Sequence, residues 1–192
     1  MVKKKLSPKV YELTISLVDI EPVVWRRVLV HEFIELSELH ILIQMVMGWQ
    51  NTHLYAFVIN GKSYSDEESA EEMRNTLVAD GTMLGDVLEN KKNFTYIYDF
   101  GDNWVHEIKI TKTLETDPRM QYPACVGGEN ACPPEDCGGP HRFEHLKSVL
   151  AGKECEEKDM IVTWVGGYYN PYTFDPNFVN KHLIWIDDEL ED

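Results

Sequence analysis

Three cysteines and one histidine lie within a single short stretch that is rich in glycine and proline. Cys125, Cys132 and Cys137 have the spacing C-x6-C-x4-C, and His141 follows as C-x3-H. Three thiolates and one imidazole form a complete tetrahedral ligand set for Zn²⁺, so the pattern predicts a structural zinc loop, with His106 as an alternative fourth ligand. Two other interpretations remain open: reduced thiols that pack as small apolar groups, and a disulfide between two of the cysteines.

A second group of candidate residues combines carboxylates with an imidazole, a ligand set that suits Mn, Fe or Zn and could activate a bound water for hydrolysis. The competing interpretation is that Asp-Phe-Gly-Asp at 99–102 is a turn, in which Asp side chains accept backbone N–H bonds and Gly101 adopts a positive φ. Pro-Pro-Glu-Asp at 133–136 would then be a capping or turn segment, and the histidine would only bond across the sheet. The candidate catalytic residues are Asp99, Asp102, His106, Glu135 and Asp136.

Aromatic residues are numerous enough to line a ligand pocket as well as to fill a core. Apolar walls with a few convergent polar groups are typical of ligand pockets. On that basis the candidate pocket residues are Arg26, Trp49, His53 and Trp104. The alternative is that the aromatic residues belong to the core and that Arg26 forms a buried charge pair with an aspartate of the 99–102 segment.

Composition and charge restrict the partners of this chain. Its 192 residues are 43% hydrophobic and 27% charged, as in an ordinary folded soluble domain. Eighteen Lys and Arg against 33 Asp and Glu give a net charge of −15, partly from an acidic tail over 187–192. This charge disfavours direct nucleic-acid binding, because such binding needs clustered basic residues and the only basic run, Lys3–Lys5, is short. The expected partner is therefore a protein or a small molecule.

No membrane insertion is expected. The longest apolar stretches fall far short of the ~20 residues that a bilayer span requires, and no apolar region follows the basic N-terminus. These observations predict a cytoplasmic location.

The apolar pattern predicts several strands in the first part of the chain. Tyr11, Leu13, Ile15 and Leu17 alternate with polar residues, as in a half-buried strand whose apolar side chains share one face. The Asn60-Gly61 pair predicts a hairpin turn after a strand. Further strands are predicted over 23–30, 54–59, 94–98 and 104–114.

Helices are predicted mainly in the second part of the chain. An early helix is expected to begin at Ser37, as the capping residue, and to end at Gly48; later ones follow over 143–151, around 160–164 and from Pro176. Residues 116–141 are rich in Pro and Gly and predict a long irregular loop. The pattern indicates one α+β domain over 1–192, with a mostly antiparallel or mixed sheet from the N-terminal part, helices packed on it, and a helical C-terminal part.

Several strings, taken in this order, resemble the plasmid pRiA4b ORF-3-like family over about residues 11–183. The resemblance implies an α+β fold and a link to plasmids or mobile elements, but no established activity. The strings are Glu-Pro-Val-Val-Trp-Arg-Arg at 21–27, Met-Gly-Trp at 47–49 with His53-Leu54, Tyr-Asp-Phe-Gly-Asp-Asn-Trp-Val-His at 98–106 and Cys-Pro-Pro-Glu-Asp-Cys-Gly-Gly at 132–139.

The sequence favours a non-catalytic binding or accessory protein, because it holds no Gly-rich phosphate loop, no G-x-S-x-G elbow and no H-E-x-x-H helix. The alternative function is a metal-dependent hydrolase that uses the carboxylate and histidine centre.

Overall fold

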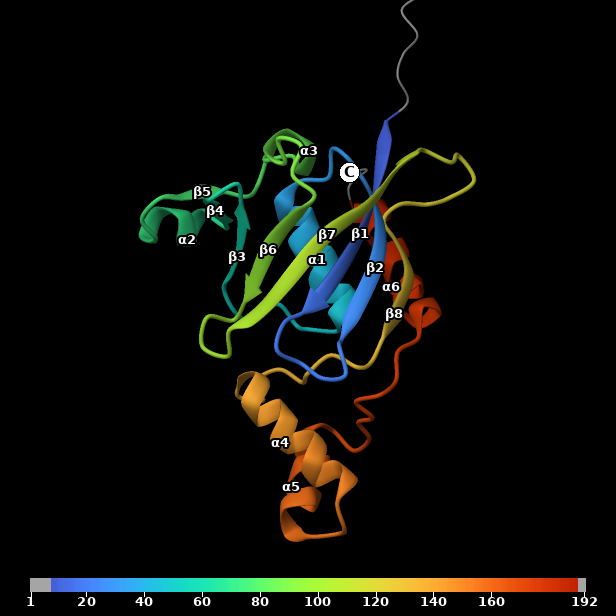
Figure 1. The fold of residues 1–192 in the computed structure, drawn as a ribbon. Coiled ribbons are helices and arrows are strands. Elements are labelled where there is room, and N and C mark those ends of the chain that lie inside the picture. The colour runs from blue at the N-terminus through green and yellow to red at the C-terminus, as the bar shows by residue number, and fades with distance from the viewer. Residues whose placement is uncertain (1–7, 190–192) are drawn as a thin grey trace, which may run out of the picture.

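A single eight-stranded sheet forms the centre of this computed structural model, which describes residues 8–189, and the side chains up to residue 183 (Figure 1). The strand order is β5-β4-β3-β6-β7-β1-β2-β8, and every neighbouring pair is antiparallel except β4 and β5. The strands are β1 (Lys9–Leu17), β2 (Trp25–His31), β3 (Tyr55–Ile59), β4 (Lys62–Ser65), β5 (Thr76–Val78), β6 (Asn93–Tyr98), β7 (Trp104–Glu115) and β8 (Ala124–Glu129). The predicted mixed sheet from the N-terminal part is confirmed.

The first strand follows the predicted alternation, and the irregularity lies in its neighbour. The register between β1 and β7 shifts between Glu12 and Leu13, where β7 has one extra residue, Thr111, as in a β-bulge. The register between β1 and β2 is continuous. Leu13, Ile15 and Leu17 are buried and Tyr11 is half-buried and packs against the same core, as predicted. Val10 and Glu12 are buried as well, which the alternation did not predict.

Helix α1 (Leu36–Met47) lies against one face of the sheet (Figure 1), and its apolar side chains are part of the core. It ends as predicted at Gly48, which adopts φ 90°. Its start differs from the prediction: Glu35 and Glu38 form a capping box, and Ser37 lies inside the first turn. Carboxylates can fill both roles of this motif, because each accepts a backbone N–H that has no partner within the helix.

The second part of the chain is helical, as predicted, but residues 116–141 are not wholly irregular. Strand β8 forms there and pairs with β2 at the edge of the sheet. Two glycines weaken its strand propensity, yet Gly128 is required, because a Cβ atom there would lie 2.5 Å from the ring of Phe174. The helices are α2 (Glu67–Glu72), α3 (Leu84–Val87), α4 (Gly139–Ala151), α5 (Glu156–Trp164) and α6 (Pro176–Glu189).

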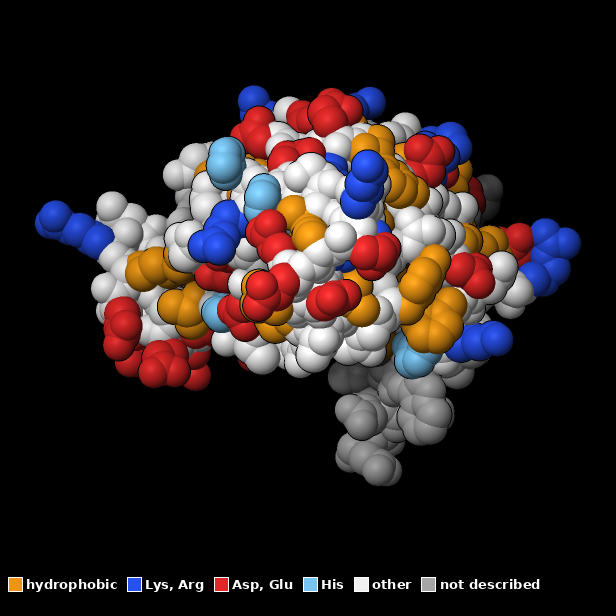
Figure 2. Space-filling model, turned by 90° about the horizontal axis from the view of Figure 1, so that it is seen from below, with side chains coloured by type: hydrophobic (Ala, Val, Ile, Leu, Met, Phe, Trp, Pro, Cys, Tyr) orange, Lys and Arg blue, Asp and Glu red, His pale blue; other side chains and the backbone are white. Residues whose placement is uncertain are grey.

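Helices α4 and α5 project beyond one end of the sheet, whereas α6 returns along β8 and α1 (Figure 1). Among residues 8–189, no helix has the length and apolar character needed to cross a bilayer. On the face shown in Figure 2, basic side chains are scattered among acidic ones. The basic run Lys3–Lys5 and the side chains of the acidic tail lie outside the described residues.

Candidate functional site

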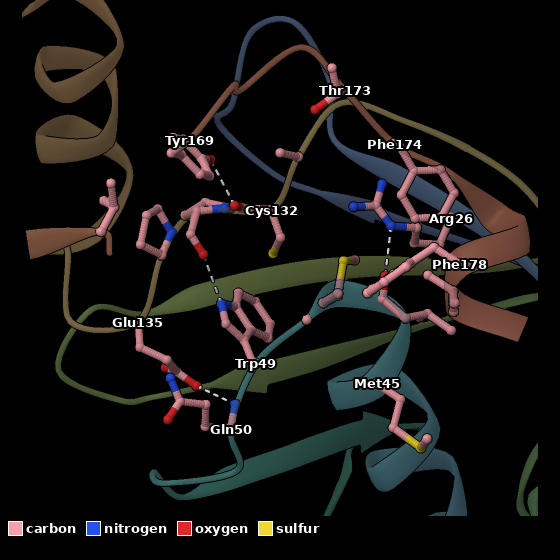
Figure 3. A pocket seen from close by; sticks show the side chains of 18 of the residues that line it. Arg26, Met45, Trp49, Gln50, Cys132, Glu135, Tyr169, Thr173, Phe174 and Phe178 are labelled. Carbon is pink, nitrogen blue, oxygen red and sulfur yellow. Dashed lines mark hydrogen bonds between the residues drawn. The ribbon is translucent and has the colours of Figure 1, made fainter. Parts of the chain in front are cut away.

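A groove of about 970 Å³ opens between three segments that are distant in the sequence (Figure 3). One wall is the C-terminal end of α1 with the residues that follow it. The second is the loop Cys-Pro-Pro-Glu-Asp at 132–136, called the Cys-Pro-Pro loop below, and the third is the segment from α5 to the start of α6. Its aromatic lining residues are Trp49, Trp164, Tyr169, Phe174 and Phe178. The groove is the size of a small-molecule site, and its walls are mainly apolar.

Arg26 lies at the inner wall of this groove and is only 1% exposed. Its Nε atom donates to the carbonyl of Val46 at 2.8 Å, and Nη1 donates to the carbonyls of Trp25 (2.8 Å) and Glu129 (2.9 Å). The guanidinium also lies 3.7 Å from the centroid of the Phe174 ring.

The expected charge pair between Arg26 and an aspartate of the 99–102 segment is wrong. Among residues whose side chains the structure describes, no carboxylate pairs with this arginine. Burial lowers the pKa of Arg26, but a guanidinium stays charged in proteins. The carbonyl of Val46 lies in the last turn of α1, so the cation also compensates the partial negative charge at that helix end.

Trp49 forms part of the opposite wall. Its Nε1 atom donates to the carbonyl of Pro133 at 3.0 Å, which fixes the Cys-Pro-Pro loop against the end of α1 (Figure 3). The Trp49 ring contacts Tyr98, at 4.8 Å between centroids, and Trp104, at 6.2 Å. Of the four predicted pocket residues, Arg26 and Trp49 line the groove, Trp104 is buried in the core, and His53 lies outside the groove lining.

The three clustered cysteines are buried free thiols. Burial raises the pKa of Cys125 and Cys132, and raises that of Cys137 to about 12. His141 is exposed at the start of α4. Within residues 8–183 the four ligand atoms of the predicted zinc loop do not meet at one point, and zinc binding by this loop stays a prediction.

Most carboxylates of the predicted catalytic centre accept hydrogen bonds from backbone amides. Asp99 accepts from the amides of Gly101 (2.9 Å) and Asp102 (3.3 Å), as a turn residue does. The positive φ of this turn belongs to Asp99 (54°) and Asn103 (56°), and the prediction of a positive φ at Gly101 was wrong.

Two further carboxylates tie the Cys-Pro-Pro loop to its surroundings. Asp102 accepts from the amide of Gly138 at 2.9 Å. Glu135 accepts from the amide of Gln50 at 2.8 Å and from the hydroxyl of Tyr98 at 2.9 Å. These bonds connect the strings at 47–54, 98–106 and 132–139 into one junction.

His106 is fully buried beneath this junction. Its Nδ1 atom lies 3.3 Å from the carbonyl of Tyr96 on the neighbouring strand, and its ring makes an edge contact with Trp49 at 5.2 Å. Burial lowers the pKa of His106 to about 4. The structure therefore places this residue in the core, away from the other predicted catalytic residues.

Two of the predicted catalytic residues instead meet a histidine that the sequence pattern assigned to the pocket. The Nε2 atom of His53 lies 2.9 Å from Asp136 Oδ1 and 3.7 Å from Asp99 Oδ2. Within the described side chains this is the one group of three His, Cys, Asp or Glu residues whose ligand atoms all lie within 4.8 Å of one another. The spacing of these residues in the sequence gives no signal of this meeting, which results from the strand order.

A buried polar network, which no pattern in the sequence indicated, links His40, Gln44, Asn51 and Tyr96. His40 lies 2.8 Å from the hydroxyl of Tyr96 and 2.7 Å from Asn51 Oδ1, and Gln44 donates to the same hydroxyl. Burial lowers the pKa of His40 to about 4. The network joins α1 to the sheet and to the segment before His53.

The mixed sheet covered by α1 and α6, with a junction of aromatic and carboxylate residues at one end, defines an α+β protein with a groove at the sheet edge. The chain belongs to the plasmid pRiA4b ORF-3-like protein family, whose family model matches residues 9–180. The predicted family resemblance is thereby confirmed.

Two relatives show how far the likeness extends. The uncharacterized protein y4hQ of Sinorhizobium fredii (strain NBRC 101917 / NGR234) is 36% identical over 161 residues, covering 82% of this chain and 81% of the relative. The crystal structure of a protein of unknown function, MM3350 from Methanosarcina mazei Go1, superposes with a TM-score of 0.80 at 35% identity, covering 89% of this chain and 97% of that one. Neither name states an activity, so a function for this chain must be argued from its own geometry.

Proposed function

We propose that this protein is a non-catalytic binding protein that holds a small molecule or a short peptide in the groove beside Arg26 and Trp49. The observation that carries the proposal is the groove itself, in which aromatic walls surround a few polar groups. Its volume of about 970 Å³ matches the upper range of ligand pockets. An accessory role linked to plasmids or mobile elements is part of the same proposal, and its support is the family description.

The polar groups of the groove indicate the kind of ligand. The Nη2 atom of Arg26 has no hydrogen-bond partner among the described residues. A guanidinium nitrogen donates to carboxylate, sulfonate or phosphate oxygens, while Phe174 and Phe178 offer apolar contact. A ligand with an apolar body and one anionic end would satisfy both.

The experiment uses the fluorescent probe 8-anilinonaphthalene-1-sulfonate, which has an aromatic body and a sulfonate. We expect saturable 1:1 binding to the native protein, with at least a tenfold loss of affinity in Phe178→Glu. Phe178 is 64% exposed, so this substitution places a carboxylate in the groove without removing a core side chain. Tyr168→Ala is the matched control, because Tyr168 is an exposed aromatic residue that does not line the groove. Binding that is unsaturable, or equal in both variants, would contradict the proposal.

Metal-dependent hydrolysis is the second candidate function, favoured by the meeting of His53, Asp99 and Asp136. The predicted set of five residues does not support it, since His106 is buried in the core and Asp102 accepts a hydrogen bond from the amide of Gly138. Turnover of p-nitrophenyl phosphate or p-nitrophenyl acetate with added Mn²⁺, abolished by Asp136→Asn, would establish this function in place of the first.

A further inference from the structure

Three segments from distant parts of the chain bring metal-ligating atoms together on the junction, and one of the three residues, Asp136, also lines the groove. His53 precedes β3, Asp99 begins the turn between β6 and β7, and Asp136 lies in the loop before α4. Each belongs to one of the strings that mark the family resemblance. Their side chains are 30%, 11% and 69% exposed, so the meeting point is open to solvent on the side of Asp136.

The two distances from His53 to the carboxylates fit ligands of one ion. Ligands that each lie about 2.0–2.2 Å from an ion are about 3–4 Å from one another in tetrahedral or octahedral arrangements. His53 Nε2 is 2.9 Å from one carboxylate and 3.7 Å from the other. A hydrogen bond from His53 accounts only for the shorter contact, to Asp136, whereas a bound ion would account for both contacts.

The charge of the site also favours a cation. Two carboxylates approach within 4.8 Å, and no Lys or Arg in the described part of the chain forms an ion pair with either of them. Close carboxylates without a cation repel each other, and a divalent ion between them removes the repulsion.

The surroundings hold the ligands in place. The amides of Gly101 and Asp102 bind Asp99 Oδ1, which leaves Oδ2 directed to His53. Next to Asp136, Glu135 is fixed through Oε1, but its Oε2 atom is buried and has no hydrogen-bond partner among the described residues. A buried acceptor without a donor is costly, and a water molecule on a nearby ion would supply that donor.

We infer that His53 Nε2, Asp99 Oδ2 and Asp136 Oδ1 bind one divalent first-row transition-metal ion, such as Zn²⁺ or Mn²⁺. One imidazole and two carboxylates suit these metals. Three protein ligands leave at least one position for water or for an anionic group. The group contains none of the thiols of the predicted zinc loop, and it shares Asp136 with the groove lining. Metal binding can be measured without a ligand in the groove.

The test is a Co²⁺ titration of the full chain after treatment with a chelator, followed by visible and near-ultraviolet absorption. Nitrogen and oxygen ligands give weak ligand-field bands, whereas thiolates add intense sulfur-to-metal charge-transfer bands. We expect one Co²⁺ per chain without charge-transfer bands, and at least a tenfold weaker affinity in His53→Gln and in Asp136→Asn. Asp136 is exposed, so its variant is expected to keep the native circular dichroism spectrum even if His53→Gln does not.

His141→Gln is the matched control, because His141 belongs to the predicted thiol site and not to this group. Unchanged Co²⁺ binding in this variant supports the inference. Charge-transfer bands that persist in Asp136→Asn would assign the metal to the cysteine loop and overturn the inference. Absence of stoichiometric Co²⁺, Zn²⁺ and Mn²⁺ binding would overturn it as well.

Discussion

Acidification should destabilise this protein through two buried histidines, and His106 provides the sharper test. Its pKa is lowered by burial from the ordinary 6.5 to about 4. In the unfolded chain the imidazole takes up a proton near pH 6.5, whereas in the native protein it does so only near pH 4. Above pH 6.5 both states are neutral and the stability is fully present; as the pH falls below 6.5 the unfolded state holds the extra proton and stability decreases.

The magnitude follows from the two pKa values. Each pH unit between them is worth about 1.4 kcal/mol, so His106 removes about 3 kcal/mol of stability once the pH has fallen to about 4. His40 has a pKa lowered to about 4 for the same reason and adds a comparable loss. The free energy of unfolding should therefore fall steeply between pH 6.5 and 4, in addition to any contribution from carboxylates.

The variant His106→Phe isolates one of the two contributions. Phenylalanine keeps the ring that contacts Trp49 and gives up only the bond of Nδ1 to the Tyr96 carbonyl. Urea unfolding measured from pH 7.5 to 4.5 should show that the stability difference between wild type and variant changes by about 2–3 kcal/mol across this window, in favour of the variant at low pH. His141→Gln, at an exposed position, should leave the slope unchanged. A wild-type-to-variant difference that stays constant with pH would refute the reasoning.

Three further predictions concern packing and thiol burial. Arg26→Met should lower the unfolding free energy by about 3 kcal/mol in urea titrations, because one buried and two part-buried carbonyls lose their donor; an effect below about 1 kcal/mol would contradict this assignment. Gly128→Ala should lower the unfolding free energy by about 1–3 kcal/mol and lower the melting temperature, since its Cβ would lie 2.5 Å from Phe174. Gly127→Ala is the control and should leave the unfolding free energy nearly unchanged, because a Cβ there meets only ordinary contacts beyond 3.4 Å. With 5,5′-dithiobis(2-nitrobenzoate), only Cys155 should react quickly in the native protein and all four thiols in denaturant; rapid reaction of a second thiol before unfolding would count against the buried positions.

Much of the fold could be predicted from local patterns. The hairpin turn at Asn60-Gly61 has the expected positive φ angles, 52° and 75°, because this pair of residues tolerates that conformation best. The end of α1 at Gly48 and the start of α6 at Pro176 also follow from the conformational preferences of single residues. These features depend on the neighbouring sequence only.

The features that escaped prediction depend on distant contacts. Strand β8 forms because the edge of β2 offers unpaired backbone groups, which nothing in its own glycine-rich sequence indicates. The partners of Arg26 come from residues 46 and 129, so its carbonyl bonds could not be distinguished in advance from a pair with a carboxylate. His53 meets Asp99 and Asp136 only because β3 and β6 are neighbours.

The inner wall of the groove has a consequence for the synthesis of the chain on the ribosome. The guanidinium of Arg26 holds residues 46 and 129 and is covered by Phe174, and Phe174 follows all eight strands of the sheet in the sequence. Every strand is therefore synthesised before the residue that covers this cation. A product terminated between Glu129 and Phe174 would contain all eight strand sequences but would lack one wall of the groove.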